Sequence, residues 1–130
     1  MALYAKLDAD LTVALDSNYR NILWKFTDDT LNTVIRTDLT VQSSGVAQVA
    51  ATTTYALPMG KVVKGKVVLV KVDQECRVRL NGGTEYITVK PSGTYKGLLQ
   101  LHGEITAISV QNQHATLATQ VEYCIVGSES

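Results

Sequence analysis

The sequence has little charge, two cysteines and no long apolar run, and each shortage excludes a class of protein. Only 18% of the 130 residues are charged, and 12 basic side chains balance 12 acidic ones, whereas a dedicated nucleic-acid binder carries a basic excess. No apolar run approaches the roughly 20 residues that a membrane-spanning helix needs, and the polar start does not resemble a signal peptide. We therefore expect neither nucleic-acid nor membrane binding, and maturation in a reducing compartment.

Motifs for catalysis and for metal or cofactor binding are missing as well. His102 and His114 lack the spacing of metal ligands, and Gly82-Gly83 lacks the lysine and helix of a phosphate loop. No Gly-x-Ser-x-Gly motif is present. Four carboxylates could supply calcium ligands but lack a complete loop and are better explained as turns or caps: Asp8, Asp10, Asp28 and Asp29. The sequence thus predicts no catalytic, cofactor-binding or metal-binding residue, no cofactor and no enzyme.

What the sequence has in abundance is β-branched residues. It holds 16 valines and 15 threonines among 130 residues, and 45% of all residues are hydrophobic. Valine and threonine are stiff at χ1 and suit a pleated surface. This length and composition predict a single all-β domain.

From residue 61 onward the strand signals are clear. The run Lys66–Val72 is almost continuously apolar, as in a central strand covered on both faces. Cys76, Val78 and Leu80 alternate with charged side chains, which predicts a half-buried strand. Asn81-Gly82-Gly83 follows directly and is typical of a tight hairpin turn. The return strand is expected over Thr84–Val89, before Pro91.

Three further strands are expected over Tyr95–Leu101, Ile105–Val110 and Leu117–Val126. Strands at intervals of about 8–12 residues predict a β-sandwich or jelly roll. Both cysteines, Cys76 and Cys124, fall inside strand patterns and are too few for a disulfide scaffold, so we expect buried free thiols. The predicted core consists of Val68, Val70, Val78, Leu80, Ile87, Val89, Ile108, Val110, Val121 and Ile125.

The first sixty residues are less clearly patterned. Leu11–Leu15 fits a strand, and 41–55 fits extended structure. Between Asp16 and Phe26 a short helix and a strand fit equally well. We expect residues 1–60 to supply an N-terminal arm or the first strands, and residues 61–130 to supply the core strands of the same domain. The alternatives are an arm that packs on another molecule and a segment that completes the sandwich.

Charge is unevenly distributed along the chain. Residues 1–60 carry four basic and six acidic side chains, residues 61–100 carry eight and three, and residues 101–130 carry none and three. The basic central block could match a charged surface of a partner or of a neighbouring copy. Alternatively, these side chains only solvate the outer faces of the strands.

The C-terminal half of the sequence carries a family resemblance. It lies in Val78-Arg-Leu-Asn-Gly-Gly-Thr-Glu-Tyr-Ile-Thr-Val, in Ile105-Thr-Ala-Ile-Ser-Val-Gln-Asn and in Val121-Glu-Tyr-Cys-Ile-Val-Gly. These stretches resemble small virion proteins of tailed bacteriophages. The resemblance spans residues 67–127 and transfers no functional residue. It implies a β-sandwich or jelly roll that decorates a capsid or belongs to a neck, tail or fibre.

Two classes of function follow from these observations. The first is a structural virion protein, foremost a capsid decoration (cement) protein that stabilises the head shell. Its expected partner is the major capsid protein or another virion protein. We expect it to act as a homo-oligomer, with a trimer favoured, in the virion after synthesis in the host cytoplasm. The second is a lectin-like carbohydrate-binding module. That module would need an exposed aromatic platform or a metal site, whereas the seven tyrosines and tryptophans are scattered along the sequence and no metal ligands are predicted.

Overall fold

The computed structural model describes residues 3–5, 10–14, 22–27 and 36–130, with side chains from Leu39 onward. All regular structure in these residues is β, so the predicted all-β class is confirmed. Accordingly, the described residues contain no helix that could cross a membrane. The strands are β1 (Leu3–Ala5), β2 (Asp10–Ala14), β3 (Ile22–Thr27), β4 (Arg36–Leu39), β5 (Val41–Val49), β6 (Thr54–Ala56), β7 (Lys64–Val72), β8 (Cys76–Leu80), β9 (Ile87–Val89), β10 (Gly97–Ile105), β11 (Ile108–Asn112) and β12 (Thr119–Ser128).

The chain divides into two compact units, Met1–Leu39 and Thr40–Ser130. The first unit contains two antiparallel pairs, β1 with β4 and β2 with β3. Strand β3 covers Ile22–Thr27, so the strand interpretation holds for those residues. The rest of the segment where a helix competed, and the carboxylates Asp8, Asp28 and Asp29, lie outside the described residues.

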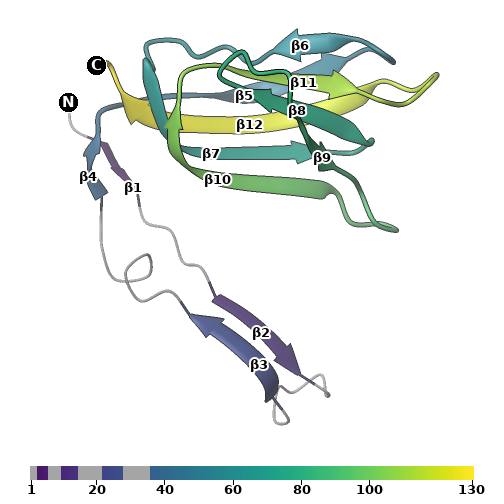
Figure 1. The fold of residues 1–130 in the computed structure, drawn as a ribbon, viewed down its shortest axis with the longest axis horizontal. Helices are drawn as coiled ribbons and strands as arrows, with labels where there is room; N and C mark the ends of the chain where they lie inside the picture. The colour runs from purple at the N-terminus through teal and green to yellow at the C-terminus, as the bar shows by residue number, and fades with distance from the viewer. Residues whose placement is uncertain (1–2, 6–9, 15–21, 28–35) are drawn as a thin grey trace. The chain divides into compact units, whose positions relative to one another are not determined.

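The second unit is a β-sandwich of two four-stranded antiparallel sheets (Figure 1). The long sheet has the order β10-β7-β12-β5, and the short sheet has the order β6-β11-β8-β9. The eight strands pair in nested fashion: β5 with β12, β6 with β11, β7 with β10, and β8 with β9. This nesting of eight strands across two sheets is the arrangement of a jelly roll.

Residues 41–56 belong to this sandwich. Strand β5 pairs with β12 along its whole length, and β6 pairs with β11. The division between compact units therefore falls at Leu39 and Thr40, rather than at residue 60, where the sequence texture changes. Strands β5 and β6 therefore belong to the unit Thr40–Ser130.

The core lies between the inner faces of the two sheets. Among the predicted core residues, Val68, Val70, Val78, Val110, Val121 and Ile125 are fully buried, and Val89 and Ile108 nearly so. Leu80 is half-buried. Ile87 was predicted wrongly, because 38% of it remains exposed. Ile87 is the first residue after the hairpin turn that pairs with β8, so one side of its side chain lacks a neighbour.

Several strand boundaries differ from the sequence prediction. The expected strand Ile105–Val110 is two strands, because Asn81 Oδ1 accepts a hydrogen bond of 2.7 Å from Thr106 N and holds a turn there. Leu117 precedes β12 and is exposed. Strand β7 is central, as predicted, but its outer face is not fully covered, since Lys71 is exposed.

Gly127 gives a sharp test of the pairing between β12 and β7. A Cβ there would overlap the carbonyl group of Lys64 at the register shift between the two strands, whereas a Cβ at Gly103 in β10 would meet no atom within 4 Å. We expect Gly127→Ala to lower the free energy of unfolding by about 1–3 kcal/mol, because backbone must shift. Gly103→Ala should change it by less than about 0.5 kcal/mol. Urea denaturation measures both, and equal midpoints would contradict this packing.

Candidate functional site

The turn between β8 and β9 is held rigidly. Asn81 and Gly82 both adopt positive φ, 56° and 70°, and Gly83 N donates a 3.0 Å hydrogen bond to Leu80 O. These are the features of a type I′ turn, which asparagine and glycine adopt at little cost. Asn81 N also donates to Ala107 O at 2.8 Å, so the predicted hairpin is present and is anchored to the neighbouring β10–β11 turn.

The pairing between β8 and β9 does not continue up to the turn of this hairpin. Cys76 pairs with Val89, and Val78 pairs with Ile87. The turn instead brings Leu80 against Gly83. Between this contact and the Val78–Ile87 pair, the return side of the hairpin therefore has two more residues than β8. Residues 84–86 therefore leave the ladder, and β9 begins only at Ile87. The predicted return strand from Thr84 is too long for this reason.

Residues 84–86, which we call the flared segment, place Tyr86 against two arginines of β8. The guanidinium carbon of Arg77 lies 4.2 Å from the ring centroid of Tyr86, and that of Arg79 lies 5.7 Å away. Arg79 also donates a 3.1 Å hydrogen bond to Gln111 Oε1 on β11. The cation–π contacts hold both arginines at Tyr86, and the hydrogen bond to Gln111 also holds Arg79. We call Arg77, Arg79 and Tyr86 the Arg–Tyr cluster.

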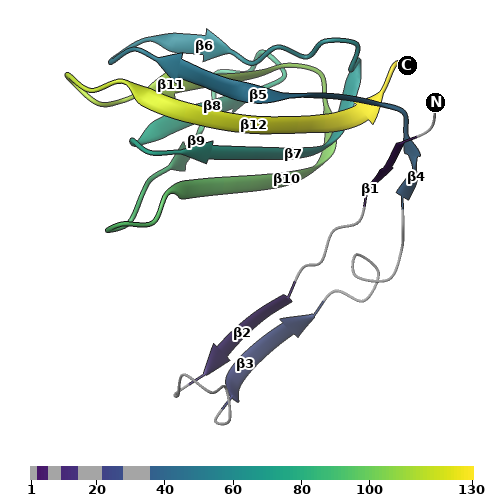
Figure 2. The same cartoon turned by 180° about the vertical axis from the view of Figure 1, so that it is seen from behind.

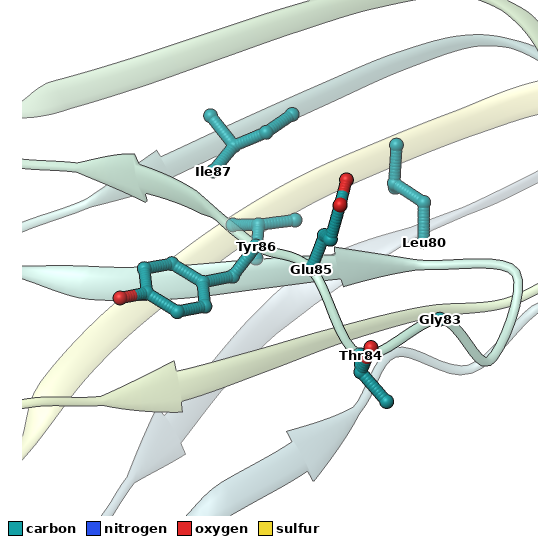
Figure 3. Close-up of a pocket in the computed structure, with 7 residues that line it drawn as sticks. Leu80, Gly83, Thr84, Glu85, Tyr86 and Ile87 are labelled. Carbon is teal, nitrogen blue, oxygen red and sulfur yellow. The ribbon is translucent and has the colours of Figure 1, made fainter.

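Beside the Arg–Tyr cluster the flared segment leaves an open pocket of about 500 Å³ (Figure 3). Its apolar lining comes from Val78, Leu80 and Ile87. Figure 3 shows Glu85 rising between Leu80 and Ile87, while Tyr86 points away from them. The Glu85 carboxylate makes no ion pair or hydrogen bond with any residue that the structure describes.

The groups gathered here suit recognition of another macromolecule. Tyrosine and arginine are enriched in protein–protein interfaces and carry much of their binding energy. Tyr86 is 45% exposed and Ile87 38% exposed, so both can be covered further on binding. The cluster was not predicted from the sequence. A signal was present, because the two-residue turn at Asn81-Gly82 sets Leu80 against Gly83 and so places Tyr86 opposite Arg77, on the face that Arg79 shares.

The basic block of residues 61–100 does not form a uniform positive surface. Lys64 pairs with Glu104 at 3.1 Å, and Lys96 pairs with Glu122 at 3.4 Å. Both pairs join the basic block to the acidic C-terminal block. They are exposed and contribute little stability, but they pair two of the three glutamates of the C-terminal block with lysines of the basic block.

The two histidines lie apart from the Arg–Tyr cluster. His102 is exposed on β10, with its Nε2 3.2 Å from the side-chain nitrogen of Gln100. His114 Nδ1 accepts hydrogen bonds from the backbone N–H groups of Thr116 and Leu117, so its Nε2 carries the proton in the neutral ring. Within the described residues no group of three or more histidine, cysteine, aspartate or glutamate side chains could hold a metal ion.

Both cysteines are free, but they occupy different environments. Cys76 is fully buried, and burial raises the pKa of its thiol to about 11. Cys124 is half-buried and lines a shallow hollow of about 240 Å³ with Leu69 and Leu98. Burial raises the pKa of the Cys124 thiol as well. The expectation of a buried thiol thus holds fully for Cys76 and only in part for Cys124.

Thiol labelling checks these environments. Because the thiolate is the reactive form, the raised pKa values predict slow labelling of the native protein at pH 8, faster as the pH rises. Cys124 should react first, and Cys76 only after unfolding. Cys124→Ser should remove the native-state reaction, whereas Cys76→Ser should keep it. Rapid labelling of both thiols without denaturant would contradict this assignment.

Comparison of this chain with known protein families, curated proteins and solved structures found no match. The contacts of the Arg–Tyr cluster, the flared hairpin and the sandwich beneath them are therefore the observations from which a function is inferred.

Proposed function

We propose that this chain is a structural protein of a tailed-phage virion, a capsid decoration protein that binds the assembled head shell and stabilises it. The observation that carries the proposal is the Arg–Tyr cluster, with half-buried arginines and an exposed Tyr86, on a hairpin whose turn is anchored by Asn81. Preorganised aromatic and arginine side chains on a rigid element are well suited to bind another protein surface.

The fold is compatible with this function but does not select it. Jelly rolls occur in viral capsid proteins and also in lectins, and one fold supports many functions. The choice between a virion protein and a carbohydrate-binding module therefore depends on the exposed side chains.

Those side chains favour a protein partner over a sugar. A sugar-binding platform needs a free aromatic face, and Arg77, 4.2 Å from the Tyr86 ring centroid, already covers one face of that ring. Tyr95, the most exposed large hydrophobic side chain of the described residues at 78%, lies in the β9–β10 connection and is not part of the Arg–Tyr cluster. The carbohydrate-binding module remains the second candidate, with this exposed tyrosine as its support.

The N-terminal unit supports the same function. Its described strands form only two-stranded sheets, β1 with β4 and β2 with β3. Two-stranded sheets are marginally stable alone in water, and a unit of about 40 residues usually needs additional stabilisation. Docking onto a shell would provide it by burying more surface.

Substitution of Tyr86 tests the proposed contact. We expect Tyr86→Ala to weaken binding to shells assembled from the cognate major capsid protein by at least about 30-fold, which corresponds to a hot-spot loss of about 2 kcal/mol. Co-sedimentation with such shells measures the affinity. Tyr95→Ala is the matched control, since it also removes an exposed tyrosine, and its affinity should be unchanged. If Tyr95→Ala alone reduced binding, or if the protein bound glycans and not shells, the proposal would fail.

Truncation tests the N-terminal unit separately. Removing residues 1–15 deletes β1 and β2 and leaves every residue of the buried core cluster in place. The truncated protein should therefore keep its sandwich, as circular dichroism would report, and bind the same shells more weakly. A folded truncated protein with unchanged affinity would show that this segment is not a docking element.

A further inference from the structure

A sandwich that does not close into a barrel has exposed edge strands, and three of the four edges in this unit are protected. Strands β6 and β9 are three residues each, and short edges offer little backbone for pairing. Strand β10 is longer, but its register shifts between His102 and Ile105, and Glu104 forms an ion pair with Lys64 beside it. Irregular and charged edges resist pairing with other strands.

Strand β5 has none of these protections. Its nine residues, Val41–Val49, include no proline and no charged side chain. It pairs with β12 through nine consecutive residues without a register shift. Among the described residues, the backbone of residues 41–48 forms hydrogen bonds only with β12. Every second residue of an edge strand directs its N–H and C=O away from the sheet, so β5 offers a regular and unpaired edge.

The edge is also firmly held in an extended shape. Val49 is 2% exposed, and Ser43 Oγ donates a 2.6 Å hydrogen bond to Pro58 O. At the middle of the strand, Gly45 leaves room for Tyr123, whose hydroxyl would lie 2.9 Å from a Cβ there. The side chains on the outer face are exposed, with Val46 at 60%. Figure 2 shows β5 at the border of the long sheet.

We propose that β5 pairs antiparallel with β5 of a second copy of this chain, centred on Gly45. Gly45 is the fifth of the nine residues, so this register pairs the whole strand. It places Ser44 opposite Val46 of the second copy, and Gln42 opposite Gln48 of the second copy. The glutamine amides can then bond to each other, and no like charges meet. The two long sheets become one continuous sheet.

The partner of β5 is a second copy of this chain, because the strand is complementary to itself. An antiparallel pair has two-fold symmetry, in which the same surface serves both partners. A partner of another kind would be selected by charges or by a distinctive pocket, and the strand sequence Val-Gln-Ser-Ser-Gly-Val-Ala-Gln-Val presents no charge. This inference does not rest on the proposed virion function. The contact yields pairs, so it does not by itself generate the trimer expected from the sequence.

Charges introduced at residues that face each other across the pair test this register. Ser44→Lys/Val46→Lys places an ammonium group of one copy opposite an ammonium group of the other, at two symmetric positions. Sedimentation equilibrium should give twice the 14.1 kDa chain mass for the unchanged protein and a dissociation constant raised at least about tenfold for this variant. Ser44→Lys/Val46→Glu places opposite charges together in the same register and should restore pairing.

Leu98→Lys is the matched control, because Leu98 is equally exposed, at 62%, but lies on the opposite edge strand β10. Its mass should equal that of the unchanged protein, and circular dichroism should show all variants folded. A monomer or a trimer of the unchanged protein at about 100 μM, where a dimer with a dissociation constant of about 1 μM is mostly formed, would overturn the proposal. So would failure of Ser44→Lys/Val46→Glu to restore pairing.

Discussion

The sandwich depends on the pairing of β12 with two strands at once. Strand β12 lies between β5 and β7 and forms a ladder with each. Without it the long sheet would separate into the β7–β10 pair and an isolated β5. Its inward residues Val121 and Ile125 are fully buried, so the same strand also supplies the centre of the core. Because β5 and β12 come from opposite ends of the unit, this pairing requires closure of the longest loop, which favours slow folding.

Buried polar side chains support β12 at the end where it begins. Asn112, which is fully buried, donates hydrogen bonds to Val49 O at 3.1 Å and to Leu117 O at 2.8 Å, and so joins β11 to the connections around β5 and β12. Thr119 is fully buried too, and its Oγ donates to Asp73 Oδ1 at 2.7 Å. Buried polar groups are costly unless their partners are present. These bonds therefore fix where the sheets meet and where β12 begins.

Local chemistry made part of this structure predictable from the sequence. Asn81-Gly82 specified its turn, because few other residues tolerate two successive positive φ values. The alternation of Cys76 and Val78 with arginines gave the correct inner face of β8. The length of the return strand was not predictable in this way, since it depends on which residue of β9 meets Val78. The exposure of Ile87 follows from the same register, which no local pattern encodes.

The nested order of strands was also beyond the sequence. Alternation indicates that a segment is a strand with one inner face, but any of several partners would bury that face equally well. The division at Leu39 and Thr40 could not be located for the same reason, because residues 41–56 reveal their role only through pairing with β12 and β11. The Arg–Tyr cluster could in principle have been found, since strand alternation puts Tyr86 on the face of Arg77 and Arg79 both in the register of the turn and in the observed one.

The two proposed contacts occupy opposite sides of the sandwich. Strands β9 and β10 contact each other at one side, and the cluster formed with β8 lies next to β9. Strand β5 borders the long sheet at the other side, as both views of the fold show (Figures 1 and 2). Pairing through β5 would therefore leave the hairpin of each copy exposed. Two hairpins carried by one rigid pair can engage neighbouring sites on a shell together, and such bivalent binding exceeds the affinity of either contact alone. A neutral edge for the second copy and a charged aromatic hairpin for the shell would keep the two associations from competing, because each surface lacks the chemistry that the other recognises.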